Sequence, residues 1–318
     1  MNKTAELCAQ RETLKAELLA LSAGPGKGMH DGGYPSPDYL KLMGPRSAAM
    51  DKCLVALIAE RDRKGPARFS RDNVWIWGGP TPYWGGSMEA DTSVKGARYF
   101  GLDNVVYVYG AVNDATLALH KSCKKLLCQL TQINRTPDAQ RESNEENAEQ
   151  LSRLSLKHPN IRGGIIDDLL GNYGYSISRN EVKKVYEALK KHNPALRLYA
   201  VVYVHELDLP SIRILAPYID CVNLWVWRKD DLPELDLHVE KCRAAFPGKE
   251  IMLGAFMHDY GASDLCQPPE LLRFQMNRAA RYLAAGKIHD LVILGDREIA
   301  KCPEAARTVK TFLDEQFA

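Results

Sequence analysis

From residue 73 onward, short apolar runs alternate with amphipathic segments along the chain. The runs are rich in β-branched and aromatic residues, and each leads into a polar or glycine-containing segment. Because they are continuously apolar, they predict strands that are buried on both faces, as in a parallel sheet. Eight strands are expected, at Val74–Trp77, Asn104–Tyr109, Lys125–Leu130, Gly163–Ile166, Arg197–Val204, Cys221–Trp227, Ile251–Met257 and Leu291–Leu294.

Helical segments are expected between the strands and after the last one. Ser178 with Glu181 predicts a capping box, and Pro268-Pro269-Glu270 predicts a helix start. The expected helices span 88–99, 114–123, 138–157, 178–192, 209–217, 231–246, 268–285 and 303–317. Eight successive strand–helix units with right-handed crossovers predict an α/β chain folded as a (β/α)8 TIM barrel. The alternative is an open doubly wound sheet, but no GxGxxG motif follows the first strand.

The first 72 residues precede this alternation. Residues 3–22 and 47–64 have helical spacing, and a stretch rich in Gly and Pro, residues 24–37, separates them. We therefore expect an N-terminal helical extension, residues 1–72, packed on a catalytic barrel, residues 73–318. Glu17 interrupts the apolar stretch near the N-terminus, so this stretch predicts an amphipathic helix rather than a signal peptide.

Composition narrows the classes of function. Hydrophobic residues make up 45% of the chain and charged residues 26%, which is typical of a globular protein. No apolar run approaches the roughly 18–20 residues of a membrane span, so no membrane association is expected. With 42 Lys+Arg against 40 Asp+Glu, the net charge of +2 provides no strong field for nucleic acid. Small neutral substrates fit this charge balance better than nucleic acid does.

The eight cysteines are scattered through the sequence. There is no CxxC pair and no His at zinc-finger spacing, so neither a structural zinc nor a cofactor is expected. Cys128 and Cys221 lie in apolar strand runs, which favours free buried thiols over disulfides. Cysteine usage therefore favours a reducing compartment, although the localisation stays open.

Acidic residues follow two neighbouring predicted strands, where catalytic groups of barrel enzymes lie. Asp167 and Asp168 come directly after Gly163–Ile166. Two adjacent acids there cost desolvation and mutual repulsion, which favours a catalytic role for at least one over a helix cap or salt bridge. Strand alternation would direct one carboxylate into the barrel mouth and the other away. Glu206, after the next strand, is a candidate general acid; a loop ion pair is its alternative.

Aromatic and polar side chains at the other strand ends are typical of a sugar-binding mouth. All five tryptophans lie on or just after the first and sixth strands, and Trp75 is expected in the core. Flat rings beside polar groups fit the faces and hydroxyls of sugars. The candidate substrate-binding residues are Trp77, Tyr83, Trp84, Tyr109, Gln129, Tyr173, His205, Asn223, Trp225, Trp227, His258, Asp259 and Asp296.

The fourth strand carries a resemblance to barrel glycoside hydrolases as a superfamily. Its run Gly163-Gly164-Ile165-Ile166-Asp167-Asp168 is similar to the Gly-apolar-x-apolar-Asp runs that bear a catalytic acid in several such barrels. The resemblance covers residues 73–317 and implies hydrolysis of a glycosidic bond, with Asp167 or Asp168 as nucleophile or acid. Many such barrels place a second Glu at strand 7, where this chain has His258-Asp259, so the second carboxylate is expected from strand 5 or strand 7.

Two other functions stay open at this point. The acids at the strand ends, together with His258, could hold a divalent metal, as in a sugar isomerase, epimerase or aldolase. A catalytically inactive barrel could use the same aromatic mouth only to bind carbohydrate. In the hydrolase interpretation the partner is a small carbohydrate and no metal is required. The sugar, the linkage, the stereochemical outcome and the oligomeric state are not predicted.

Overall fold

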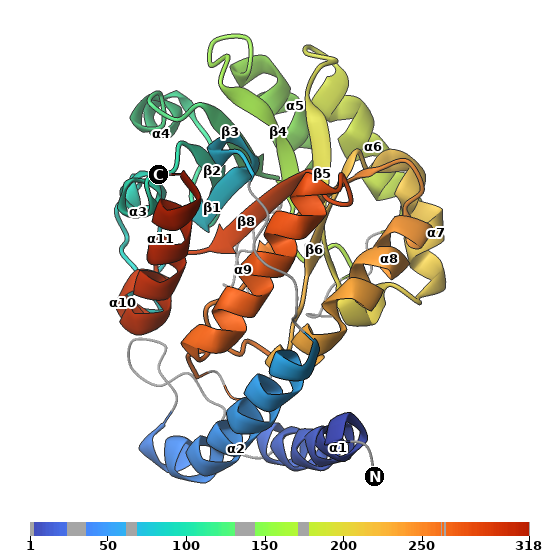
Figure 1. Cartoon of the computed structure of the whole chain (residues 1–318). Coiled ribbons are helices and arrows are strands. Elements are labelled where there is room, and N and C mark those ends of the chain that lie inside the picture. Colours follow the sequence, from blue (N-terminus) through green and yellow to red (C-terminus); the bar gives the residue numbers. More distant parts are fainter. Residues whose placement is uncertain are drawn as a thin grey trace.

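Eight parallel strands close into one barrel in sequence order, with β8 paired to β1 (Figure 1). The computed structural model describes residues 3–23, 36–61, 69–130, 144–170, 178–261, 263 and 265–317. The strands are β1 (Val74–Gly78), β2 (Asn104–Tyr107), β3 (Lys125–Gln129), β4 (Ile161–Ile166), β5 (Arg197–Tyr203), β6 (Cys221–Trp225), β7 (Glu250–Ala255) and β8 (Asp290–Leu294). The predicted (β/α)8 TIM barrel is confirmed, and the open doubly wound sheet was the wrong alternative.

Helices surround the barrel and precede it. They are α1 (Lys3–Ser22), α2 (Pro37–Arg61), α3 (Thr92–Phe100), α4 (Asp114–Leu119), α5 (Asn144–Leu154), α6 (Arg179–Lys190), α7 (Pro210–Leu215), α8 (Leu235–Ala245), α9 (Pro269–Ala284), α10 (Glu298–Lys301) and α11 (Pro303–Phe317). The 3-10 turns are η2 (Arg71–Asn73), η3 (Tyr83–Gly85), η4 (Val204–Glu206), η5 (Ala216–Tyr218) and η6 (Lys229–Glu234). The capping box of Ser178 and Glu181 begins α6 as predicted.

Helix α2 begins at Pro37, ten residues before its predicted start at residue 47. Proline is favoured in the first turn of a helix, where no N–H is needed. Pro45 lies inside the helix and removes one backbone hydrogen bond. Met43 and Met50 on either side of it are fully buried. Burial of this apolar face therefore outweighs the local Gly-Pro signal that predicts a break.

The strands are buried on both faces because their residues alternate between two cores. Val74 and Ile76 face the apolar layer between the barrel and its helices, whereas Trp75 and Trp77 face the barrel interior. Trp75 is 1% exposed, as expected of a core residue. The interior core is rich in aromatic rings and continues to the carboxyl ends of the strands, where it forms the base of a pocket.

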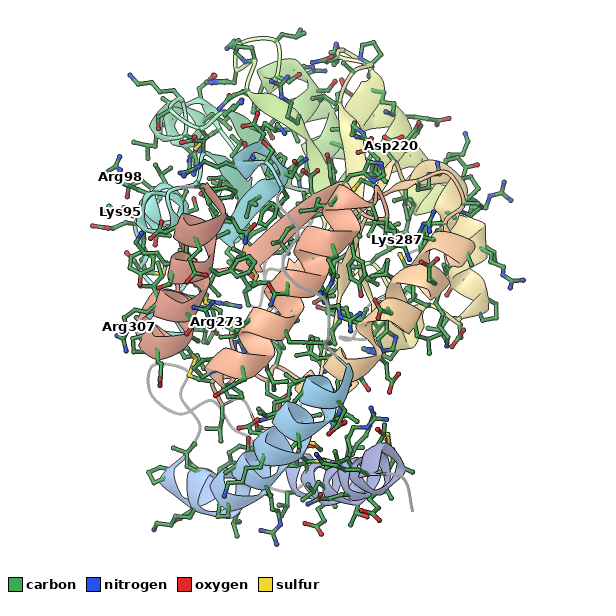
Figure 2. The ribbon with its side chains drawn as sticks, in the orientation of Figure 1. Lys95, Arg98, Asp220, Arg273, Lys287 and Arg307 are labelled. Atoms are coloured by element: carbon green, nitrogen blue, oxygen red, sulfur yellow. A yellow bond between two sulfur atoms is a disulfide. The ribbon has the colours of Figure 1, made fainter. Side chains whose placement is uncertain are left out.

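Charged side chains cover the outer surface of the helices. Lys95, Arg98 and Arg307 extend away from the barrel (Figure 2). Exposed ion pairs such as Arg273–Glu315, at 3.1 Å, contribute only about 0–1 kcal/mol each. The fold is therefore held by its two cores. None of the described helices combines the length and the apolar character needed to cross a membrane.

The N-terminal helices pack beside segments that follow β6 and β7. Arg11 on α1 donates a hydrogen bond to Glu234 at 3.0 Å, and Lys15 contacts Asp231 at 2.8 Å. Figure 1 shows α1 and α2 together at one side of the barrel, with α2 next to the start of α9. The extension therefore lies close to loops at the carboxyl ends of two strands. The division of the chain at residue 72 stays a prediction.

A disulfide joins Cys266, in the loop after β7, to Cys302, between α10 and α11. Cys128 and Cys221 are free and buried, as expected. The sequence did not indicate the disulfide, because its cysteines lie 36 residues apart and form no motif. Cysteine usage thus gives no support to a reducing compartment.

Candidate active site

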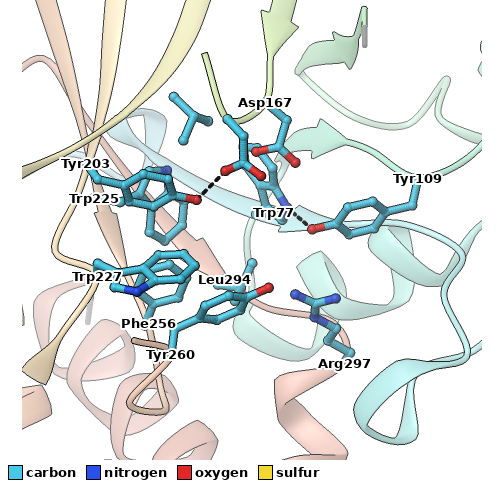
Figure 3. Close-up of a pocket in the computed structure, with 12 residues that line it drawn as sticks. Trp77, Tyr109, Asp167, Tyr203, Trp225, Trp227, Phe256, Tyr260, Leu294 and Arg297 are labelled. Atoms are coloured by element: carbon cyan, nitrogen blue, oxygen red, sulfur yellow. Dashed lines mark hydrogen bonds between the residues drawn. The ribbon is translucent and has the colours of Figure 1, made fainter. Parts of the chain in front are cut away.

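A pocket lies at the carboxyl ends of the strands, with about 510 Å³ of empty space including the part open to solvent. Seven of the eight strands, or the residues just after them, contribute to its wall (Figure 3). Among the described residues it is lined by Trp77, Tyr109, Asp167, Asp168, Val201, Tyr203, Trp225, Trp227, Phe256, Tyr260, Leu294 and Arg297. This position is where (β/α)8 enzymes carry their active sites.

Aromatic rings make most of the wall. Trp77 and Trp225 meet edge to face, with ring centroids 5.7 Å apart. Phe256 lies 4.5 Å from Trp225, and Tyr260 lies 4.6 Å from Trp227. Such contacts stabilise ring pairs by about 0.5–1.5 kcal/mol each beyond their burial. The rings therefore hold one another in a fixed aromatic wall.

Two glycines make room for the tryptophans of this wall. A Cβ at Gly254, on β7, would lie 2.0 Å from the Trp225 ring. A Cβ at Gly261 would lie 2.1 Å from Cδ1 of Trp227, and the Gly261 N–H donates to the Trp227 carbonyl at 2.8 Å. Any side chain at either position would displace a tryptophan, because ordinary carbon contacts begin near 3.4 Å.

Asp167 and Asp168 both line the pocket. The expectation that strand alternation separates them was wrong, because β4 ends at Ile166 and Asp168 adopts a left-handed backbone with φ of 48°. Tyr203 Oη donates a hydrogen bond to Asp168 Oδ1 at 2.5 Å (Figure 3). This bond favours the ionised form of Asp168. Burial and the charges of Asp168 and Asp167 raise the pKa of Tyr203 well above 10, so its hydroxyl stays protonated and donating.

Tyr109 is the second residue with an unusual backbone in the pocket. Its φ is 67°, and among the described residues only Tyr109 and Asp168 combine positive φ with a side chain. The Tyr109 N–H donates to Gln129 Oε1 at 2.8 Å, and its hydroxyl accepts from Trp77 Nε1 at 3.1 Å. Such backbone strain costs about 1–3 kcal/mol and is concentrated at functional sites. Burial raises the pKa of Tyr109 to about 12, so its hydroxyl is also neutral.

Arg297, just after β8, brings a positive charge to the pocket. Its side chain is 6% exposed, and its Cζ lies 5.3 Å from the centre of the Tyr109 ring. Figure 3 shows the guanidinium pointing into the cavity near Tyr260 and Tyr109. The pocket thus combines two carboxyl groups and one cationic guanidinium within an aromatic wall.

Glu206 lies behind the pocket and is not among its lining residues. Its Oε2 accepts the backbone N–H of Tyr203 at 2.8 Å, and the side chain is 4% exposed. Burial raises the pKa of Glu206 to about 7. The geometry gives Glu206 a role in shaping turn η4, and its assignment as general acid stays a prediction.

Four further candidates support the pocket from behind. Gln129 holds the backbone of Tyr109, as described above. Asn223 Oδ1 accepts from Trp225 Nε1 at 2.8 Å. Asp296 accepts backbone N–H groups of Gly79 at 3.1 Å and Arg297 at 2.8 Å, and burial raises its pKa to about 6. His258 is fully buried, and its Nδ1 lies 2.8 Å from Glu298 Oε2. These residues position lining residues rather than contacting the cavity themselves.

Asp259 belongs to a buried polar cluster that links α2 to the pocket wall. Its Oδ1 accepts the Lys229 N–H at 3.2 Å, and its Oδ2 accepts the Ser263 hydroxyl at 2.8 Å. Lys229 Nζ lies 2.7 Å from Ser47 Oγ and 2.6 Å from Asp51 Oδ1, both on α2. The loops that present Trp227 and Tyr260 are therefore fastened to the N-terminal helices.

The remaining candidates lie at the edge of the pocket or outside the described residues. His205 is exposed and stacks on Tyr203, with centroids 5.6 Å apart. Tyr83 lies in η3 and is not among the lining residues. The side chain of Trp84 and the whole of Tyr173 lie outside the described residues.

Sequence reasoning missed Tyr203, Phe256 and Arg297 as site residues. The period of two along β5 would have found Tyr203, because Tyr199, Val201 and Tyr203 all join the interior core. The same period applies on the seventh predicted strand, where Phe256 faces inward. Arg297 follows a strand end by three residues, and no local pattern indicates that its side chain turns into the cavity.

The acids proposed as metal ligands do not come together. Within the described part of the chain, no group of three or more His, Cys, Asp or Glu residues could hold a metal ion. Asp168 contacts Tyr203, Glu206 contacts a backbone N–H, and Asp259 contacts Ser263. This arrangement gives the metal-dependent isomerase no structural support.

Comparison with known proteins gives a fold but no family. The sequence matches no family model and no curated protein. A putative α-L-fucosidase from Bacteroides thetaiotaomicron matches with a TM-score of 0.50 and 14% identity, over 69% of this chain and 83% of that one. A family GH18 chitinase from Chromobacterium violaceum matches with a TM-score of 0.47 and 13% identity, over 78% and 85%.

A putative β-galactosidase from Bacteroides fragilis has a TM-score of 0.45 and 13% identity over 70% of this chain. The match spans only 35% of that enzyme. At such identities the likeness shows the barrel fold alone. The fold and the pocket together define a (β/α)8 barrel with an aromatic, acid-bearing pocket at the carboxyl ends of its strands.

Proposed function

We propose that the pocket hydrolyses a glycosidic bond with Asp167 and Asp168 as its carboxylate pair. The observation that carries the proposal is that both acids line one aromatic pocket at the carboxyl end of β4, with Asp168 held by Tyr203. Glycoside hydrolysis by the common mechanisms requires one acid that gives a proton and one carboxylate that stays charged. The Tyr203 hydrogen bond favours the charged state for Asp168, which leaves Asp167 as the proton donor.

In this mechanism Asp167 protonates the glycosidic oxygen while the bond from that oxygen to the anomeric carbon breaks. Asp168 either attacks the anomeric carbon or takes a proton from the water that does so. Water supplies the new hydroxyl group, and its proton returns to the carboxylate pair. A separation of about 5–5.5 Å between the carboxyl groups gives retention, and about 6.5–9.5 Å gives inversion.

The wall suits a sugar ring. The tryptophan and phenylalanine rings provide flat apolar surfaces for the faces of the sugar, and the hydroxyls of Tyr109, Tyr203 and Tyr260 provide polar groups at the edge of the same cavity.

The test is release of reducing sugar or nitrophenol from a panel of glycosides. Wild type is compared with Asp167→Asn and Asp168→Asn, with and without EDTA, and with Asp38→Asn as a control. Asp38 is exposed on α2 and pairs only at the surface with Lys41. We expect EDTA-insensitive activity that falls about 1,000-fold or more in each pocket variant, since loss of a catalytic group costs several kcal/mol.

Two outcomes would replace the proposal. Activity on free sugars that appears only with added metal, with none on glycosides, would favour the isomerase. Binding of sugars by wild type and by both Asn variants with equal Kd, without turnover, would favour a non-catalytic carbohydrate-binding barrel.

A further inference from the structure

Helix α2 contacts two loops of the pocket wall through buried polar groups. Lys229, after β6, has a fully buried side chain, and its Nζ lies 2.6 Å from Asp51 Oδ1 and 2.7 Å from Ser47 Oγ, both on α2. The Ser47 hydroxyl in turn donates to Ser263 Oγ, in the loop after β7, at 3.2 Å. One helix outside the barrel is therefore bonded to the loop after β6 and to the loop after β7.

The two loops are also bonded to each other beside the pocket. The Lys229 N–H donates to Asp259 Oδ1 at 3.2 Å, and the Gly261 N–H donates to the Trp227 carbonyl at 2.8 Å. Trp227 precedes Lys229 by two residues, and Tyr260 directly follows Asp259. A shift of Lys229 would therefore move the backbone that carries both rings.

Trp227 and Tyr260 form the outer part of the aromatic wall. Both are partly exposed, whereas Trp225 and Phe256 beside them are buried. The ring centroids of Trp227 and Tyr260 lie 4.6 Å apart, and Figure 3 shows the two side chains next to each other. Trp225 lies on β6 and Phe256 directly follows β7, so the barrel fixes the inner rings. The places of the outer two rings depend on the loops.

A buried ion pair fixes a geometry more effectively than it stabilises a fold. Replacing such a pair with apolar side chains is often neutral or stabilising, because burial removes the hydration of both charges. Charge-assisted hydrogen bonds are directional, however, and the ammonium of Lys229 contacts both Asp51 and Ser47. Such a pair can define where the loops lie without adding to the net stability.

We propose that Lys229 and Asp51 are positioning residues of the pocket. Through the two loops they set the places of Trp227 and Tyr260, and with them the affinity of the pocket for a sugar. The inference rests on the proposed function in this last step, where the two rings contact the substrate. Helix α2 then belongs to the functional unit, although it lies outside the barrel.

Fluorine NMR of protein labelled with 5-fluorotryptophan tests the placement without any substrate. The chain has five tryptophans, and replacing each in turn with Phe assigns the resonances. In Asp51→Asn we expect the Trp227 resonance to move, while that of Trp75, which is 1% exposed in the barrel interior, stays in place. Glu240→Gln neutralises an acid in a surface pair with Lys287, so it is the matched control and should move neither resonance.

A double variant keeps the test valid if an unpaired Lys229 prevents folding. Asp51→Asn combined with Lys229→Met leaves no unpaired charge and should move the same resonance. A Trp227 resonance that stays in place in the folded variants would overturn the inference. Equal movement of all five resonances would also overturn it, because it indicates a general loosening of the fold.

Kinetics on a cleaved glycoside separate positioning from catalysis. We expect Asp51→Asn to raise KM about 3- to 10-fold, the effect of losing one ring contact, and to leave kcat within about twofold. The reason is that Asp167 and Asp168 lie on another strand end and keep their contacts. A fall in kcat with an unchanged KM would overturn the link to sugar affinity.

The two proposals can fail independently. Movement of the Trp227 resonance in Asp51→Asn, in a protein that cleaves no glycoside, would retain placement by α2 and overturn hydrolysis. Cleavage that depends on Asp168, in a protein whose Trp227 resonance does not respond to Asp51→Asn, would retain hydrolysis and overturn this inference.

Discussion

Tyr203 holds Asp168 through a hydrogen bond of 2.5 Å inside the pocket. Replacing Tyr203 with Phe removes this donor while keeping the ring, so the negative charge of Asp168 loses its stabilisation. We expect kcat/KM on a cleaved glycoside to fall about 10- to 100-fold, the range for loss of one charge-assisted hydrogen bond of roughly 1.5–3 kcal/mol. Tyr186→Phe, at a tyrosine packed outside the barrel, is the control. Equal rates for Tyr203→Phe and wild type would contradict this role.

Glu206 gives the fold a dependence on pH. Its pKa is raised from 4.5 to about 7 by burial. Between these values the unfolded chain releases the proton and the folded chain keeps it, so the stabilisation is complete below pH 4.5 and is lost as pH rises to about 7. Glu206→Gln keeps an acceptor for the Tyr203 N–H but cannot titrate. In wild type, the free energy of unfolding should fall by about 3 kcal/mol as pH rises from 4.5 to about 7. In Glu206→Gln this fall should be absent.

Urea unfolding at several pH values measures this effect, and the same variant tests the sequence-based assignment of Glu206 as general acid. Glu206→Gln should retain activity if its role is structural. A loss as large as that of Asp168→Asn would assign the proton donor to Glu206 instead of Asp167.

The sequence predicted the acids at strand 4 but not which side chains reach the cavity. Alternation holds only while the chain is extended, and it stops where Asp168 turns left-handed and where Glu206 enters a 3-10 turn. Asn223 was found because it lies within a strand, yet its side chain binds the Trp225 indole instead of facing the cavity. The Asn223 amide also donates to the Met252 carbonyl on β7 at 3.0 Å, and a contact of this kind depends on a strand that is distant in sequence.

At the scale of elements, α2 is fastened to the barrel by a buried ion pair. Lys229 is 1% exposed and lies 2.6 Å from Asp51. Lys229→Met would leave the Asp51 carboxylate without its counter-charge, so we expect the free energy of unfolding to fall by about 3 kcal/mol. Adding Asp51→Asn should recover part of this loss.

Urea unfolding provides this measurement, with Lys287→Met as the control. Lys287 forms a surface pair with Glu240 at 2.6 Å, so its replacement should cost less than about 1 kcal/mol. A Lys229 variant as stable as this control would show that the α2 contact is dispensable.

The sequence predicted the strands more accurately than it predicted the side chains that line the pocket. A strand between two cores must be apolar on both faces. Runs such as Leu291–Leu294 can therefore be recognised as strands from the sequence alone, without knowing which strands pair with them. Helix α2 was placed less well, because its Gly44-Pro45 signal is local whereas the burial of Met43 and Met50 depends on the packed molecule.

At the scale of the whole molecule, the disulfide between Cys266 and Cys302 links the loop after β7 to the turn between α10 and α11. It closes a loop of 36 residues, for which the loss of chain entropy in the unfolded state predicts about 3–4 kcal/mol of stabilisation. We expect reduction, or the change Cys266→Ser, to lower the free energy of unfolding by this amount.

Urea unfolding with and without a reductant checks the value, and mass spectrometry after alkylation checks the bond itself. The Cys266→Ser variant should not respond to the reductant. Wild type that is alkylated at both cysteines without reduction would contradict the disulfide.

Chemical rescue is the most direct test of the carboxylate pair. In Asp168→Ala, a small anion such as azide can occupy the space of the missing carboxylate and attack the anomeric carbon. Azide should restore cleavage of an activated glycoside, and a glycosyl azide should form and be detectable by mass spectrometry. Undiminished hydrolysis by Asp168→Ala without azide, and no glycosyl azide when it is added, would contradict catalysis by this pocket.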